Sequence, residues 1–203
     1  MNTYTICLPV LSLLRHPRRS TAAILLCISA LGWSNFSLAE NARVLMQTNM
    51  GNVEMEVLEK LAPRTAANFL QLVDDEFYSG LIFHRVIANF MIQAGGFTED
   101  LTRKPAPRTV PNESFNGLKN SRGSVAMART DDPDSAGSQF YINVKDNPFL
   151  DADGAKAGYT VFARVISGMD TVEKIELTNT GRRGGMVAVP EENIVILSIQ
   201  RIE

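Results

Sequence analysis

Cysteine, tryptophan and histidine are scarce in this 203-residue chain, and they are unevenly placed. Most of them fall within the first 39 positions, as Cys7, His16, Cys27 and Trp33. Residues 40–203 therefore contain no cysteine, no tryptophan and a single histidine, His84. Without cysteine there is no thiol nucleophile, thiol redox pair or thiolate zinc site, and one histidine cannot build a two- or three-histidine metal site. A Ser-His-Asp triad would have to use His84.

The first 39 residues follow the order of regions that is typical of a secretory signal peptide. A basic cluster at 15–19 precedes an apolar run at 21–32 and the small-residue site Ser37-Leu38-Ala39. The apolar run is short for a membrane-spanning helix, which needs about 20 residues. We predict cleavage after Ala39, a periplasmic protein, and no stable membrane association after processing. An uncleaved N-terminal anchor is the alternative.

Residues 40–203 have the character of one globular domain. The hydrophobic fraction of the chain (45%) and its charged fraction (21%) are those of an ordinary soluble globule. The formal net charge of −2 indicates no nucleic-acid partner. A cysteine-free exported domain has no disulfide to form in an oxidising compartment. We expect a single domain that acts as a monomer.

Apolar periodicity and turn residues predict about eight short strands and two helices in this domain. Pro63 suits the first turn of one helix, which ends near Asp74-Asp75, and the second helix spans 168–177. Strands are expected at 44–48, 53–58, 83–96 (strand, turn, strand), 124–128, 138–144, 159–165 and 194–202. The segments 98–120 and 178–190 are expected to be loops. Strands before, between and after the helices favour an antiparallel barrel over a doubly wound sheet.

The stretch 83–96 places one permanent cation and one amide among large apolar side chains. Period-two alternation would put Phe83, Arg85 and Ile87 on one face, and Met91 with Gln93 on one face after the turn. His84 would then point away from Arg85, as an interior histidine. Taken alone, an arginine beside aromatic residues on a strand is usually a solvated edge charge or a salt-bridge partner.

Five sequence blocks, in order, change that interpretation. They are Phe83-His84-Arg85-Val86-Ile87 continuing to Phe90-Met91-Ile92-Gln93, Gly123-Ser124-Val125-Ala126-Met127-Ala128, Gly137-Ser138-Gln139-Phe140-Tyr141-Ile142, Phe149-Leu150-Asp151, and Tyr159-Thr160-Val161-Phe162. Together they resemble the signature of the cyclophilin family of peptidyl-prolyl isomerases, across nearly all of 43–203. With the signal segment, the chain resembles the exported bacterial cyclophilins.

The resemblance implies a mainly β fold, a closed eight-stranded antiparallel barrel capped by two α-helices, with the active site on its outer face. It implies Arg85 as the catalytic residue with Gln93 beside it, proline-containing polypeptides as partners, and neither a cofactor nor a metal. The implied proline pocket consists of Phe90, Met91, Tyr141 and Leu150, and the rest of the groove of Ala128, Arg129, Gln139, Phe149 and Tyr159.

Three of these positions depart from the best-known members of the family. Tyr141 stands where Phe is usual, Phe149 where many members have Trp, and Tyr159 where His is common. None of these changes removes the arginine, so the implied activity is kept.

An arginine suits this chemistry because rotation about an X-Pro bond needs no nucleophile. Amide resonance sets a barrier of roughly 18–20 kcal/mol, and rotation requires the nitrogen lone pair to leave conjugation. A donor aimed at the prolyl nitrogen stabilises the twisted state more than the planar one. The guanidinium of Arg85 stays charged at any physiological pH.

Two alternatives remain open at this point. The same groove could bind proline-containing segments without catalysis, as a chaperone or adaptor does, and a small exported hydrolase is a weaker rival. Phe90 and Met91 could be barrel core, and Phe140 is expected to be core because it alternates with Tyr141.

Overall fold

The computed structural model describes residues 41–202, which all belong to a single unit, Ala39–Glu203. The predicted signal peptide at 1–39 and its cleavage site lie outside the described residues. Within the described range, no helix is both long and apolar enough to cross a membrane.

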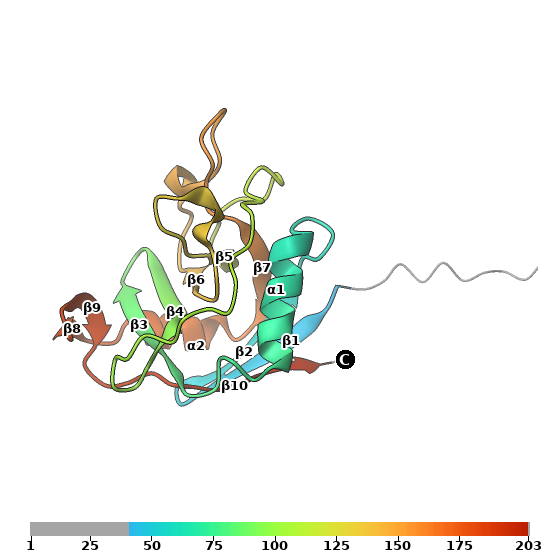
Figure 1. The fold of residues 1–203 in the computed structure, drawn as a ribbon. Coiled ribbons are helices and arrows are strands. Elements are labelled where there is room, and N and C mark those ends of the chain that lie inside the picture. Colours follow the sequence, from blue (N-terminus) through green and yellow to red (C-terminus); the bar gives the residue numbers. More distant parts are fainter. Residues whose placement is uncertain (1–40, 203) are drawn as a thin grey trace, which may run out of the picture. The chain divides into compact units, whose positions relative to one another are not determined.

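The described residues form ten strands and two α-helices (Figure 1). In chain order these are β1 (Arg43–Thr48), β2 (Gly51–Val57), α1 (Pro63–Asp74), β3 (Leu81–Ile87), β4 (Met91–Thr98), β5 (Ser124–Met127), β6 (Phe140–Asn143), β7 (Val161–Ser167), α2 (Met169–Glu176), β8 (Thr180–Arg183), β9 (Met186–Pro190) and β10 (Ile196–Ile202). Two short 3₁₀ turns, Pro133–Ser135 and Pro148–Leu150, lie in the connections. The predicted strands and both predicted helices are present, with boundaries that shift by a few residues.

Eight strands form one antiparallel sheet in the order β10-β1-β2-β7-β5-β6-β4-β3. The predicted closure of this sheet into a barrel is wrong. No ladder joins its end strands, β3 and β10. The residues just before β10 form only an isolated bridge between Val195 and Ile82 and a hydrogen bond from the Phe83 N–H to the Ile194 carbonyl (2.9 Å). The sheet is therefore a curled, open half-barrel in which β10 has a ladder with β1 alone.

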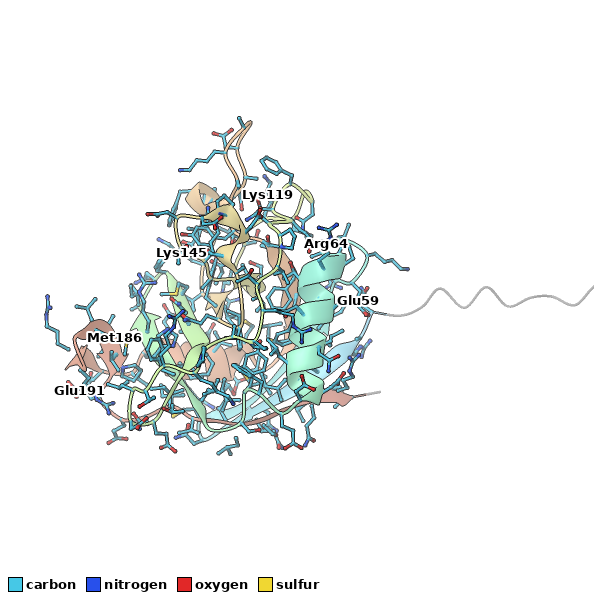
Figure 2. The ribbon with its side chains drawn as sticks, in the orientation of Figure 1. Glu59, Arg64, Lys119, Lys145, Met186 and Glu191 are labelled. Carbon is cyan, nitrogen blue, oxygen red and sulfur yellow. The ribbon has the colours of Figure 1, made fainter. Side chains whose placement is uncertain are left out.

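The segment 178–190, predicted to be a loop, contains a β-hairpin. Its turn is Gly184-Gly185, both with positive φ (54° and 79°), the backbone that favours a two-residue hairpin turn. Strand β9 packs against β3, and Figure 1 shows the hairpin beside that end of the sheet. Met186 and Glu191 lie on or next to this hairpin in Figure 2. The hairpin thus shields an edge strand that would otherwise expose unpaired backbone groups.

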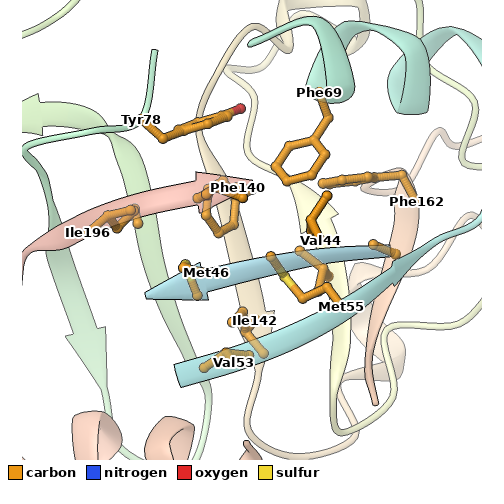
Figure 3. Close-up of a cluster of buried hydrophobic side chains, with 14 of the residues drawn as sticks. Val44, Met46, Val53, Met55, Phe69, Tyr78, Phe140, Ile142, Phe162 and Ile196 are labelled. Carbon is orange, nitrogen blue, oxygen red and sulfur yellow. The ribbon is translucent and has the colours of Figure 1, made fainter. Parts of the chain in front are cut away.

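The main core lies between the sheet and α1 and is rich in aromatic side chains (Figure 3). The ring of Phe69 on α1 lies 5.0 Å from Phe162 and 5.9 Å from Phe140, centre to centre. Tyr78 packs edge-on against Phe140 at 5.5 Å and donates its hydroxyl proton to the Ser138 carbonyl (3.0 Å). Phe140 is therefore core, as predicted. Each buried ring of this kind stabilises the fold by about 1.5–3 kcal/mol.

A distant carboxylate caps the start of α1. Pro63 occupies the first turn, as predicted, and Ala62 at the N-cap position has no side-chain hydrogen bond to offer. Glu113, from the long connection between β4 and β5, accepts the N–H groups of Arg64 (3.1 Å) and Thr65 (2.8 Å) instead. The cap also anchors that connection, which runs on toward the groove described below.

Candidate active site

Arg85 and Gln93 stand opposite each other on the neighbouring strands β3 and β4. Arg85 Nη1 donates to Gln93 Oε1 at 3.4 Å and lies 3.7 Å from Met91 Sδ. Its Cζ is 5.9 Å from the centre of the Phe90 ring. The structure therefore brings together the two residues predicted to be catalytic, with a half-buried guanidinium beside two apolar side chains.

The predicted alternation along β3 holds for Ile87 but not for Phe83. Ile87 lies on the same side as Arg85, whereas Phe83 is fully buried in the main core. The β3–β4 pairing shifts register between Phe83 and Arg85, which marks a β-bulge or irregularity. A bulge re-aims the side chains on one side of it, and this one separates the arginine from the core.

A second, smaller apolar cluster lies apart from the main core, next to Arg85. We call it the groove cluster. Its buried members are Met91, Ala126, Tyr141, Leu150 and Val161, and its partly buried members are Ile87, Phe90, Leu118, Ala128 and Tyr159. All four residues of the predicted proline pocket are in this cluster. They come from β4, β6 and the turns before β4 and before β7.

Phe149 forms an exposed margin of the same groove. Its ring is 69% exposed and stacks on Phe90, with centres 5.6 Å apart and an interplanar angle of 24°. Phe149 therefore lies beside the predicted pocket residue Phe90 and is open to solvent.

Four members of the groove cluster were not predicted to be site residues: Ile87, Leu118, Ala126 and Val161. The signal for three of them was present in the sequence, since alternation already placed Ile87 on the face of Arg85. Ala126 precedes Ala128 by two residues and Val161 follows Tyr159 by two, so period-two alternation puts each on the face of a predicted neighbour. Ala126 also pairs with both Tyr141 and Val161 across the strands.

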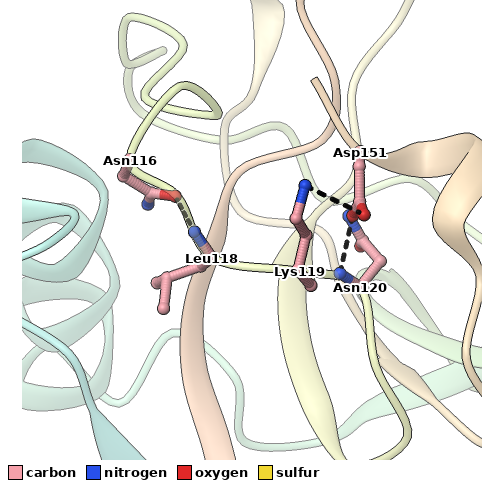
Figure 4. A network of polar contacts seen from close by, with 5 residues as sticks. All are labelled: Asn116, Leu118, Lys119, Asn120 and Asp151. Carbon is pink, nitrogen blue, oxygen red and sulfur yellow. Dashed lines mark hydrogen bonds and ion pairs between the residues drawn. The ribbon is translucent and has the colours of Figure 1, made fainter. Parts of the chain in front are cut away.

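A polar network holds the Tyr141 hydroxyl behind the pocket. The hydroxyl donates to Asn120 Oδ1 (2.8 Å), and the Asn120 N–H donates to Asp151 Oδ1 (2.8 Å). Lys119 Nζ is 3.6 Å from the other Asp151 oxygen. Figure 4 shows Lys119 and Asn120 converging on Asp151, which follows Leu150 in the chain. The network therefore ties the loop before β5 to the segment that carries the pocket residue Leu150.

Gln139 continues the line of polar groups that begins at Arg85. Gln93 Nε2 donates to Gln139 Oε1 at 3.0 Å. The backbone carbonyl of Gln139 accepts the Ala128 N–H (2.9 Å). Gln139 therefore lies beside Gln93 and Ala128 lies beside Gln139, and the Ala128 N–H serves the fold rather than a bound peptide.

Arg129 braces the far side of the groove. Its Nε donates to the Gly158 carbonyl (3.2 Å) and its Nη2 to the Ala157 carbonyl (3.0 Å). Its Cζ lies 4.6 Å from the centre of the Tyr159 ring, in a cation–π arrangement. Arg129, Tyr159, Leu150 and Phe149 line a pocket of about 310 Å³ at this position. The guanidinium therefore fixes the segment that carries Tyr159.

Burial alters the ionisation of three groups near the groove. It lowers the pKa of Arg85, which nevertheless stays charged because an arginine pKa starts so high. It raises the pKa of Tyr141, so that hydroxyl keeps its proton. It lowers the pKa of His84 to about 4. His84 is 4% exposed, packs its ring 4.6 Å from that of Phe97, and is neutral at pH 7 as an interior residue.

The described residues 41–202 hold no group of three or more His, Cys, Asp or Glu side chains that could bind a metal ion. The acidic loop at 131–134 uses its carboxylates locally. Asp132 Oδ1 accepts the Asp134 N–H (3.0 Å), and Asp134 Oδ1 accepts the Asn112 N–H (2.8 Å).

An arginine, an amide partner and an adjoining apolar pocket on the outside of an antiparallel sheet are the arrangement that the resemblance implied. A sequence profile described as "Cyclophilin type peptidyl-prolyl cis-trans isomerase/CLD" matches residues 43–201. The chain belongs to this family. The match runs from the first residue of β1 to the last but one of β10.

Curated bacterial proteins are similar to this cyclophilin over most of their length. A "Peptidyl-prolyl cis-trans isomerase" of Acinetobacter baylyi is 51% identical over 160 residues, which are 79% of this chain and 85% of that protein. "Peptidyl-prolyl cis-trans isomerase A" of Dickeya dadantii is 42% identical over 187 residues, 92% of this chain and 98% of that protein. "Peptidyl-prolyl cis-trans isomerase B" of Escherichia coli is 46% identical over 159 residues, covering 77% and 97% of the two chains.

Solved structures share the fold of this cyclophilin. A Cryptosporidium parvum cyclophilin-type peptidyl-prolyl cis-trans isomerase is 26% identical, with a TM-score of 0.68 over 80% of this chain and 98% of that chain. A structure of the same parasite protein in the presence of the dipeptide Ala-Pro has a TM-score of 0.67 at 27% identity, over 79% of this chain and 99% of that chain.

Proposed function

We propose that this cyclophilin accelerates X-Pro isomerisation by presenting Arg85 to the prolyl nitrogen while the groove cluster holds the proline ring. The observation that carries the proposal is the position of the guanidinium. Nη1 lies 3.7 Å from Met91 Sδ, and Cζ lies 5.9 Å from the Phe90 ring centre. A ring seated on these two side chains would bring its nitrogen within reach of the arginine.

The energetics favour electrostatic stabilisation of the twisted amide. As the nitrogen pyramidalises, its lone pair becomes a better hydrogen-bond acceptor, so the interaction with Arg85 strengthens in the transition state. A half-buried guanidinium acts in a medium of lower effective dielectric than water, where one preorganised donor is worth about 3 kcal/mol. The reaction needs no proton transfer, so a group with a pKa near 7 is not required.

Gln93 has a supporting role in this mechanism. Its Oε1 accepts from Arg85 and its Nε2 donates to Gln139, so its amide is held by both ends. The amide thereby fixes one side of the guanidinium fork and leaves other N–H groups free to turn to the substrate. A bound peptide can also meet Gln93 directly, through the carbonyl that precedes proline.

The rest of the groove would bind the residues that flank proline. Phe149 offers an exposed aromatic face, and Tyr159 offers a ring held in place by Arg129. A structure of a C. parvum relative in the presence of Ala-Pro supports a proline-containing peptide as the ligand class. Family membership and the names of the relatives favour catalysis over a purely binding role.

The test is isomerisation of an Ala-Pro peptide, followed with a protease that cleaves only the trans form. Purified protein should accelerate the slow phase in proportion to its concentration. A protein that binds the peptide but leaves the rate unchanged would instead establish the non-catalytic alternative. Sedimentation of the same sample tests the expected monomer.

We also propose that the isomerase acts in the periplasm on exported proteins, after cleavage following Ala39. The order of basic, apolar and small-residue regions supports this. The match to the Dickeya isomerase takes in 187 residues, more than residues 40–203 alone can supply, so part of the presequence region has a counterpart in that relative. Intact-mass measurement on periplasmic protein should show residues 1–39 missing. A full-length chain in the inner membrane would contradict the proposal and establish the anchor.

A further inference from the structure

Gly96, on β4, is packed directly under the side-chain amide of Gln139. A Cβ at this position would lie 2.5 Å from both Cδ and Nε2 of Gln139 and 2.6 Å from its Cγ. Real Cβ atoms essentially never come so close to another heavy atom. The backbone of Gly96 does not have a positive φ, so any residue could adopt its conformation. Glycine is therefore required at position 96 because a Cβ would overlap Gln139, and not because of the backbone conformation.

The amide that occupies this space is part of the chain of hydrogen bonds that leads to Arg85. Gln139 Oε1 accepts from Gln93 Nε2 (3.0 Å), and Gln93 Oε1 accepts from Arg85 Nη1 (3.4 Å). Because Gln139 holds the NH₂ group of Gln93, the Gln93 oxygen has to face the arginine. If the Gln139 side chain moved, the Gln93 amide would be free to turn, and Arg85 would lose its fixed partner.

We infer that Gly96 is a positioning residue for the isomerase reaction: by lacking a Cβ, it seats Gln139 so that Gln93 and Arg85 stay aligned. The atoms that a Cβ would meet belong to the Gln139 side chain from Cγ outward, not to the backbone, so rotation about the Cα–Cβ bond of Gln139 moves all of them. An alanine at position 96 can therefore be accommodated by a rotation of the Gln139 side chain. This rotation should change the stability of the fold little, but it should disturb the alignment of Arg85.

The neighbouring glycine shows what a purely structural position looks like. Gly95 has a positive φ of 87°, and a Cβ there would lie 2.7 Å from the backbone carbonyl oxygen of Ser138. Neither the strain nor that contact can be relieved by a side-chain movement. Substitution of Gly95 should therefore lower stability, whereas substitution of Gly96 should lower turnover.

The experiment compares kcat, KM and melting temperature for wild type, Gly96→Ala, Gln139→Ala and the double variant. Gly181→Ala is the matched control, since Gly181 has open space around its Cβ position and no positive φ. We expect Gly96→Ala to fold and to lose about fivefold in kcat, the factor that one lost hydrogen bond is worth, with a smaller change in KM. In the Gln139→Ala background the three atoms nearest to the Cβ at position 96 are gone, so the alanine there should cost no further activity. The side-chain NH₂ resonances of Gln93 should shift alike in both single variants.

A Gly96→Ala protein with wild-type kcat, or one that loses further activity in the Gln139→Ala background, would overturn the inference. If Gly96→Ala alone fails to fold but the double variant folds and matches Gln139→Ala, the contact with Gln139 is upheld. If neither folds, Gly96 is a structural residue and the inference fails. The inference rests on the role proposed for Arg85, and the two fail separately. If Arg85→Ala keeps its activity, the role proposed for Arg85 is wrong. If Arg85→Ala is inactive but Gly96→Ala is fully active, only the role inferred for Gly96 is wrong.

Discussion

Replacing Arg85 with alanine tests the mechanism most directly. The substitution removes the guanidinium that lies beside Met91 and Phe90 of the groove cluster. If that group supplies about 3 kcal/mol in the transition state, kcat/KM should fall roughly a hundredfold. The loss should appear mainly in kcat, because the donor acts on the twisted amide more than on the planar one.

The same substitution should leave the fold intact. The side-chain contacts of Arg85 are long, at 3.4 Å to Gln93 and 3.7 Å to Met91, and its side chain is half-buried on the groove side of β3. We expect the free energy of unfolding to change by no more than about 1 kcal/mol. Circular dichroism and a denaturant titration of each variant would verify this before any rate is compared.

Arg85→Lys is the matched control, since it keeps the charge but loses the planar fork. Lysine has one ammonium group in place of the fork, so it cannot hold Gln93 and reach the substrate with the same geometry, and rescue should be partial. The assay is protease-coupled isomerisation of an Ala-Pro peptide between about pH 6 and 9, where the wild-type rate should not vary because no group that titrates there takes part. A folded Arg85→Ala protein with a rate near that of wild type would refute the mechanism and leave the groove as a binding site.

Three further predictions concern the groove and its surroundings. Tyr141→Phe should keep the activity but lower the free energy of unfolding by about 1 kcal/mol, because Asn120 loses the hydroxyl donor. Denaturant titration measures this change, and an unchanged free energy of unfolding would contradict the role of the network. Phe149→Ala should raise KM with little effect on stability, since the ring is 69% exposed and stacks only on Phe90 at the margin of the groove. Peptide kinetics measure KM and the melting temperature reports stability. A large loss of stability would show that the ring belongs to the core. Burial lowers the pKa of His84 from 6.5 to about 4, so the unfolded chain binds a proton that the folded chain does not, and stability should fall as the pH drops from about 6.5 to about 4, by at most about 1.4 kcal/mol per pH unit. His84→Asn should flatten this part of the stability curve, and an unchanged slope in that variant would assign it to the carboxylates.

Local features of the site could be predicted from the sequence because they depend on short-range periodicity. Arg85 and Gln93 meet because two strands joined by a tight turn bring them opposite each other. Alternation along 83–96 placed Arg85 on a face with Ile87 and Gln93 on a face with Met91, whereas their roles in the site came from the family resemblance. Alternation failed only at Phe83, where a bulge breaks the period. The pattern of apolar and polar residues in the sequence does not predict where a bulge will interrupt the alternation.

Long-range features were predictable only through the family resemblance, or not at all. The Tyr141 hydroxyl, Asn120 and Asp151 meet from positions 21 and 31 residues apart, and no periodicity connects them. The open edge of the sheet depends on how far its curl carries β10 toward β3, which is a property of accumulated strand twist. The hairpin at 178–190 was missed although its Gly184-Gly185 pair is a recognised turn signal.

The pairing of β1 with β10 limits the order in which the strands can pair while the chain is being synthesised. Arg43 lies opposite Ile202, so the first strand of the sheet has one of its two neighbours at the very end of the chain. Contacts of such long sequence separation form late in folding, since the intervening chain has to be ordered first. A chain still emerging from a ribosome leaves one edge of β1 unpaired until β10 has been synthesised. Among the strands that the structure describes, β10 comes last in the chain, so that edge is the last part of the sheet to be paired.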